Sequence, residues 1–157
     1  MKIQDQVCTI EQAKKLKELG VEQKSLFFWY EDEKLGGVFR SVGMMLNSTE
    51  YNYSAFTAAE LGVMLPNTLP VTDSSLVEHQ KFYLLRQLFP CEDCEGYNTD
   101  YEAVTHDLEY DGTFFSSKGE TEAISRAAML IYLIENNLIT AEKVNENLNK
   151  NIHEKAN

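Results

Sequence analysis

Five residues in the first third of this 157-residue chain are aromatic or cationic and could bind a ligand: Trp29, Tyr30, Arg40, Tyr51 and Tyr53. Aromatic rings stack on a nucleobase, and a guanidinium binds a phosphate group. These residues are therefore the candidate ligand-binding set. The competing interpretation is that the rings form the core and its rim while Arg40 makes a surface ion pair, because aromatic strands are usually buried.

A second candidate is the Cys-Glu-Asp-Cys motif from Cys91 to Cys94. A structural zinc site would need two more ligands, and His79, His106 and Cys8 are available, but no second closely spaced pair supplies them. The acidic residues inside the motif give its thiolates no cationic help, which disfavours redox catalysis. The favoured interpretation is a loop with two ordinary thiols, and a small zinc-binding or hydrolytic protein is kept as an alternative.

Other catalytic patterns are missing from the sequence. It has no nucleophile elbow, no Walker A sequence, no GxGxxG and no Asp-x-Asp-x-Asp metal loop. We therefore assign no catalytic residue, no metal ligand and no cofactor. The question of enzymatic activity stays open, and the sequence favours a non-enzymatic protein.

The composition limits the classes of partner. The formal net charge of −11 argues against a surface that wraps duplex nucleic acid, which needs clustered Lys and Arg. It still permits a local basic pocket, or an acidic surface that meets a basic partner. The odd number of cysteines, the lack of a secretory signal at Met1 to Gln6 and the lack of a long apolar run favour the cytoplasm and no membrane contact.

The strongest helix signal runs from Gly119 to Ile139, where apolar residues recur at three- and four-residue steps around more than half the circumference. We expect this central helix to be covered on more than one side, with Arg126 paired to Glu122 on its surface. Capping boxes predict three helix starts, at Thr9, Thr57 and Ser117. Further helix boundaries are a glycine stop at Gly20, a proline stop at Pro66 and a cap at Thr140.

Strands are predicted at Ser25 to Glu31 and Val38 to Leu46, joined as a hairpin through Gly36-Gly37, and at Tyr101 to Asp107. The segment Leu76–Phe89 is compatible with a helix or a strand, and we favour a polar turn followed by a strand ending at Pro90. Residues 90–100 are expected to form a loop, and the Asp111-Gly112 pair a turn.

The predicted order is α-β-β-α-β-β-α-α. It indicates one compact α+β domain over residues 1–157, with a mostly antiparallel sheet of about four strands packed by the central C-terminal helix. Residues 151–157 are expected to fray. Because the strand at residues 25–31 is apolar on both faces, we also expect a homo-oligomer.

Three segments, CTIEQAKKLKELG, AFTAAELGVMLP and ETEAISRAAMLIYLIENNLI, resemble a family of small uncharacterised phage and prophage proteins of gut bacteria, Bacteroidetes and Firmicutes. That family has no established activity, so the resemblance implies a context in the bacterial host and no site residues. It suggests a non-enzymatic accessory binding protein that acts in counter-defence by sequestering a nucleotide-type host signal. The alternative is an acidic protein-interaction or DNA-mimic inhibitor of a host protein.

Overall fold

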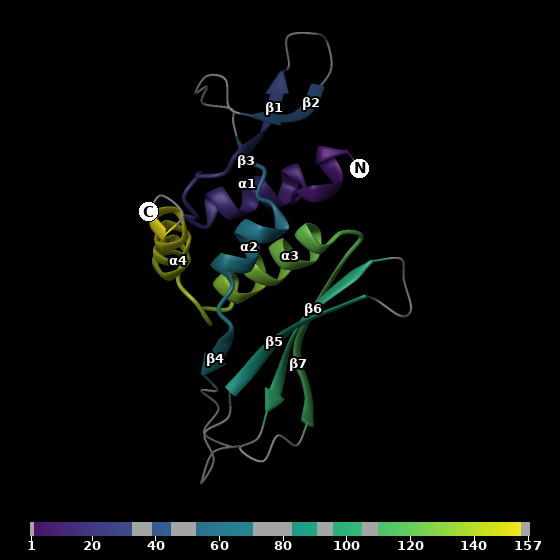
Figure 1. Ribbon diagram of the computed structural model, residues 1–157, viewed down its shortest axis with the longest axis vertical. Helices are drawn as coiled ribbons and strands as arrows, with labels where there is room; N and C mark the ends of the chain where they lie inside the picture. The colour runs from purple at the N-terminus through teal and green to yellow at the C-terminus, as the bar shows by residue number, and fades with distance from the viewer. Residues whose placement is uncertain are drawn as a thin grey trace.

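The computed structural model describes the backbone of residues 2–32, 39–44, 53–70, 83–90, 96–104 and 110–154, and the side chains of residues 2–30, 53–69, 96–101 and 115–150 (Figure 1). The elements in chain order are η1 (Ile3–Gln6), α1 (Ile10–Glu18), β1 (Phe27–Asp32), β2 (Phe39–Met44), β3 (Tyr53–Ser54), α2 (Ala58–Met64), β4 (Thr68–Pro70), β5 (Tyr83–Pro90), β6 (Tyr97–Val104), β7 (Tyr110–Gly119), α3 (Glu122–Glu135) and α4 (Ala141–Glu154). The predicted α+β class is confirmed. The predicted helices and strands recur in the predicted order, and further strands are added.

The strands form two antiparallel sheets, ordered β2-β1-β3 and β4-β5-β6-β7. Figure 1 shows the two sheets at opposite ends of the molecule with α1, α2 and α3 between them. The four-stranded sheet contacts α3 through β6 and β7, as expected for the central helix. The first predicted hairpin belongs to the other sheet, because β1 takes the short strand β3 as its second neighbour.

Two of the three predicted capping boxes are confirmed. The Thr9 hydroxyl accepts from the Gln12 amide at 3.2 Å while the Gln12 side chain accepts from the Thr9 amide at 3.0 Å. Thr57 and Glu60 make the same reciprocal pair at the start of α2. Gly20 has φ = +89°, a left-handed conformation that ends α1 without the steric cost of a Cβ atom.

The third capping box, at Ser117, is wrong. Residue 117 lies inside β7, and the cap of α3 is Thr121, whose hydroxyl accepts from the Ile124 amide at 3.3 Å. The Ser117 hydroxyl donates instead to the Ser125 carbonyl at 2.8 Å. The strand continues to Gly119 because pairing with β6 satisfies the N–H and C=O groups of its backbone. A helix cap at Ser117 would satisfy fewer of these groups.

The strand boundaries after residue 80 also differ from the predictions. Residues 83–90 are the strand β5, which supports the strand interpretation for that part of the segment Leu76–Phe89. The predicted loop at residues 90–100 is wrong where the structure describes it, because β6 begins at Tyr97. Asp111 and Gly112 lie within β7, so the predicted turn is wrong as well.

The core combines the inner faces of the four α-helices with buried side chains from both sheets. Tyr101 on β6 is fully buried, and its hydroxyl donates to the Pro66 carbonyl. The helices contribute fully buried side chains from α1, α2 and α3, namely Leu16, Leu61, Met64, Met129, Leu130 and Leu133. α4 adds Val144 and Leu148 and continues to Glu154, beyond the residue at which fraying was predicted. In the described part of the chain, no helix is both long enough and apolar enough to cross a membrane.

Candidate functional site

Two lysines of α1 converge on one aromatic ring of β3. The ammonium of Lys14 lies 5.3 Å from the centroid of the Tyr53 ring, and that of Lys17 lies 4.9 Å from it. Both distances fall within the range of a cation–π contact. Lys14 and Lys17 are three residues apart in the helix, so their side chains project from the same face. We refer to these three residues as the Lys–Tyr patch.

The amphipathic character of α1 explains how the patch is held. Ile10, Ala13 and Leu16 are buried, which leaves the intervening lysines at the rim and on the outside of the helix. The third lysine of this helix, Lys15, points elsewhere, because its ammonium lies 2.8 Å from Glu135 of α3. The hydrogen bond with Glu135 raises the pKa of Lys15. The helix therefore divides its positive charges between an ion pair and the Tyr53 ring.

The strand register decides which of the five predicted ligand residues lie together. Tyr53 is opposite Trp29 in the β1–β3 pairing, so these two rings share a face of the sheet. Tyr30 is half-buried and lies on the other face, because successive side chains alternate. The backbone of Arg40 pairs with Glu31. Tyr51 lies outside the described residues. The structure thus brings Tyr53 together with two lysines of α1.

Trp29 is a core residue. Its side chain is 8% exposed, and its indole Nε1 donates to the Cys8 carbonyl at 2.9 Å. A buried indole needs such a partner for its N–H group. The structure therefore favours, for Trp29, the interpretation that the aromatic strand is part of the core, and it leaves Tyr53 as the ring next to positive charge.

Among the cysteines and histidines, Cys8 is the one whose side chain the structure describes. Burial raises the pKa of the Cys8 thiol to about 12, so Cys8 stays protonated at neutral pH and is a poor nucleophile. The predicted zinc candidates Cys91, Cys94, His79 and His106 lie outside the described residues. Within the described residues, no group of three or more His, Cys, Asp or Glu side chains could hold a metal ion.

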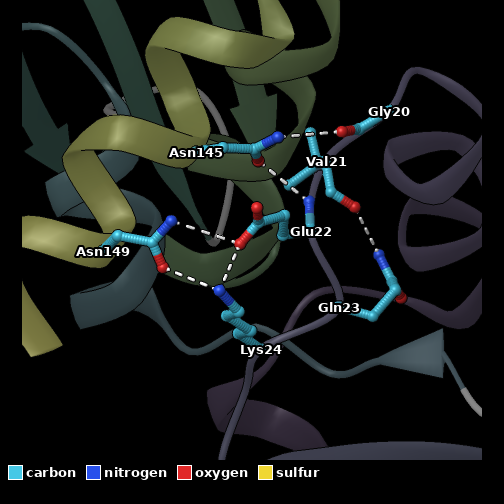
Figure 2. Close-up of polar contacts among 7 residues, drawn as sticks. All are labelled: Gly20, Val21, Glu22, Gln23, Lys24, Asn145 and Asn149. Carbon is cyan, nitrogen blue, oxygen red and sulfur yellow. Dashed lines mark hydrogen bonds and ion pairs between the residues drawn. The ribbon is translucent and has the colours of Figure 1, made fainter.

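A polar cluster holds α4 against the segment that follows α1 (Figure 2). The Asn145 side chain accepts from the Glu22 amide at 2.9 Å and donates to the Gly20 carbonyl at 3.0 Å. One turn later, Asn149 accepts from the Lys24 ammonium at 3.0 Å and donates to the Glu22 carboxylate at 3.2 Å. Lys24 and Glu22 also form an ion pair at 2.6 Å. These bonds satisfy the extended backbone after α1, so the cluster has a structural role.

An open groove of about 420 Å³ lies between the C-terminal end of α2 and α4. Its walls are apolar on the α2 side and polar on the α4 side, and the residues that line it are Gly62, Val63, Leu65, Pro66, Asn67, Asn147 and Lys150. Among the described residues that line the groove, Lys150 is the one cationic side chain and none is aromatic. The groove therefore offers less to an aromatic anion than the Lys–Tyr patch does.

Comparisons with protein-family models, with curated proteins and with solved structures found no match. The resemblance to small phage proteins stays a prediction.

Proposed function

We propose that this chain is a non-enzymatic binding protein whose ligand is a nucleotide-type anion held at the Lys–Tyr patch. The observation that carries the proposal is the position of two ammonium groups, 4.9 and 5.3 Å from the centroid of a half-buried tyrosine ring. An ammonium binds a phosphate group, and a phenol ring stacks on a base. The ligand would take over the ammonium group of Lys17 from the ring, exchanging a weak cation–π contact for a charged hydrogen bond.

The charge distribution along the chain supports an anion at this end of the molecule. Residues 1–44 carry seven basic and seven acidic side chains, whereas residues 45–157 carry seven basic and eighteen acidic ones. The segment that contains α1 is therefore neutral, although the whole chain has a net charge of −11. The basic side chains of this segment balance its acidic ones, so the segment itself does not repel an anion.

In the setting that the sequence resemblance suggests, such a protein would act during phage infection or from a prophage. It would sequester a nucleotide-type signal of the host in the bacterial cytoplasm and so blunt a defence response. A homo-oligomer is part of the proposal, and light scattering on the purified chain tests that part separately.

Isothermal titration calorimetry with a panel of nucleoside monophosphates, cyclic mononucleotides and cyclic dinucleotides tests the ligand class. At least one member should bind, and binding should weaken as the salt concentration rises, because exposed charges are screened. A Lys14→Gln/Lys17→Gln variant should bind about tenfold more weakly, since a charge contact at the protein surface contributes up to about 1 kcal/mol. A Tyr53→Leu variant should also bind more weakly, because it keeps an apolar side chain and loses the ring.

The matched control is Lys143→Gln/Lys150→Gln, which removes two exposed lysines from α4 and leaves the Lys–Tyr patch intact. This control should bind like the unmodified chain. Failure of every nucleotide to bind at millimolar concentration would refute the proposed ligand class. Equal weakening by the control, or by the control alone, would place the ligand outside the patch.

The excess of acidic residues beyond residue 44 favours a second candidate function, an acidic surface that occupies the nucleic-acid site of a basic host protein. This candidate predicts that duplex DNA competes with the chain for such a partner. A partner that binds the chain and duplex DNA at the same time would exclude DNA mimicry.

A further inference from the structure

The groove between the C-terminal end of α2 and α4 has a volume of about 420 Å³. This volume lies in the range of about 300–1,000 Å³ that is typical of ligand-binding pockets. Val63, Leu65 and Pro66, at and just after the end of α2, form its apolar side. Val63 and Pro66 are only half-buried, so an apolar group that covers them further gains free energy. The groove therefore has both the room and the surface to bind an aliphatic side chain.

Two side chains of α4, Asn147 and Lys150, form the polar side of the groove. They are three residues apart, so they are neighbours on one face of the helix. Neither side chain makes a hydrogen bond or an ion pair with the residues that the structure describes. Glu146, the acidic side chain one turn before Lys150, is held by Lys143 at 3.0 Å. The groove is therefore lined by an amide and an ammonium group whose bonding capacity is unused.

Two other asparagines of α4 hold the fold together. Asn145 and Asn149 each make two hydrogen bonds with the segment that follows α1, as Figure 2 shows. Each is two residues from Asn147, and with 3.6 residues per turn both face nearly the opposite way on the helix. The bonds that attach α4 to the described part of the fold thus leave Asn147 and Lys150 available for a partner.

The groups in the groove specify the chemistry of that partner. The Lys150 ammonium binds a carboxylate, and the Asn147 amide both donates and accepts, which matches the N–H and C=O groups of a peptide bond. The last residue of a protein chain offers a carboxylate, a peptide bond and a side chain together. An aspartate or glutamate inside a chain carries its carboxylate on the side chain, so it has no aliphatic group for the apolar side of the groove.

We propose that the groove binds the C-terminal end of a partner protein whose last residue is aliphatic, such as leucine or valine. Its carboxylate is bound by Lys150, its last peptide bond by Asn147, and its last side chain packs on Val63 and Pro66. One exposed ion pair and one amide contribute little, so the dissociation constant should be about 0.1–1 mM. The groove shares no residue with the Lys–Tyr patch and does not depend on its ligand.

The probe is the tetrapeptide N-acetyl-Ala-Ala-Ala-Leu with a free carboxyl group. Titrated to about 5 mM into the ¹⁵N-labelled chain, it should shift the amide signals of residues 62–67 and 147–150 and leave those of Lys14, Lys17 and Tyr53 in place. The same peptide with a C-terminal amide should bind about fivefold more weakly, because it loses the ion pair. 4-Methylpentanoate, which keeps the carboxylate and the aliphatic group without the peptide bond, should also bind more weakly than the free acid.

Three results would overturn the proposal. The first is the absence of any shift at residues 62–67 and 147–150 when the free acid reaches about 5 mM. The second is equal affinity for the free acid and the amide, which would mean that the carboxylate is not recognised. The third is equal affinity for 4-methylpentanoate, which would make the occupant a small carboxylic acid and not a protein chain.

Variants assign the binding to residues. Lys150→Gln should weaken binding of the free acid about fivefold and leave the amidated peptide unaffected, and Lys150→Arg should keep full affinity because a guanidinium also binds a carboxylate. Asn147→Leu should weaken both peptides about fivefold. Lys118→Gln, at an exposed lysine of β7 outside the groove, is the control and should bind both peptides like the unmodified chain. Equal weakening of both peptides by Lys150→Gln, or unchanged binding in Asn147→Leu, would refute the assignment.

Discussion

Replacing Gly62 by alanine should destabilise this protein, although the same change in an open helix is stabilising. Gly62 lies inside α2, and an added Cβ atom would overlap Nη1 of Arg126 and lie 3.3 Å from its Cζ atom. The guanidinium would have to move. In the native structure, Nη1 donates to the Ala58 carbonyl at 3.1 Å and Nη2 forms an ion pair with Glu122 at 2.5 Å. The alanine variant should therefore lose both interactions.

The size of the effect follows from these two interactions. Losing a hydrogen bond from a charged donor costs about 1.5–3 kcal/mol, and losing an i,i+4 ion pair costs about 0.3–0.5 kcal/mol. The Arg126 side chain is only 17% exposed, so solvent screens the first loss weakly. Alanine returns about 1 kcal/mol through its higher helix propensity. The free energy of unfolding should fall by about 1–2.5 kcal/mol.

Urea denaturation followed by circular dichroism measures this difference. In an Arg126→Ala background the obstacle is gone, so Gly62→Ala should then stabilise the protein by about 1 kcal/mol. Ala59→Gly, at an exposed neighbouring position of α2, is the control for helix propensity and should cost about 1 kcal/mol. If Gly62→Ala stabilises the unmodified chain, or if its effect is the same in both backgrounds, then the Arg126 guanidinium is not the obstacle at position 62.

Three further predictions concern single side chains. Gly119→Ala should destabilise the fold by about 1–3 kcal/mol, because its Cβ would overlap the backbone nitrogen of Ser125, which cannot swing aside. Ser54→Ala should leave stability unchanged or raise it by about 1 kcal/mol, because the buried Ser54 Oγ has no partner. Burial raises the pKa of Cys8 from 9.0 to about 12, so the thiol stays protonated in the folded state at pH values where it ionises in the unfolded state. Ionisation then favours the unfolded state, and the free energy of unfolding falls as the pH rises from about 9 toward 12. In urea denaturation at pH 8, 9 and 10, the free energy of unfolding should therefore fall less steeply with pH in Cys8→Ala than in the unmodified chain, by up to about 1.4 kcal/mol per pH unit.

Each of these three predictions would be contradicted by a different result. A neutral Gly119→Ala would mean that β7 and α3 can separate at low cost. A loss of more than about 1 kcal/mol in Ser54→Ala would mean that the hydroxyl has a partner after all. Parallel pH profiles for Cys8→Ala and the unmodified chain would show that the thiol has the same pKa in the folded and unfolded states.

Several features that depend on residues within four positions of each other were predictable from the sequence, although the capping box at Ser117 and the turn at Asp111-Gly112 were not. The capping boxes at Thr9 and Thr57, the glycine stop at Gly20 and the pair between Glu122 and Arg126 are all confirmed. Their donors, acceptors and charges are brought together by the helix geometry alone. Such interactions form in the same way wherever the helix packs.

The sheets could not be fully predicted from the sequence, because they depend on pairing between distant segments. The sequence of β7 has Asp111-Gly112 near its start, which favours a turn, yet residues 110–119 form a strand because β6 pairs with them along their length. The first hairpin was predictable as a hairpin, but its separate sheet requires β3, a two-residue strand too short to be recognised from its sequence.

The candidate site also combines features that were predictable from the sequence with features that depend on tertiary packing. The sequence by itself determined that α1 has a lysine-rich outer face and that aromatic residues cluster between residues 26 and 56. Only the tertiary structure decided that Trp29 is buried, with its Nε1 donating a hydrogen bond to the Cys8 carbonyl. It also decided that Lys14 and Lys17 contact the ring of Tyr53, which is more than thirty residues away in the sequence. The reason is physical: helical periodicity is a local property of the chain, whereas contact between a helix and a distant strand follows from how the whole core packs.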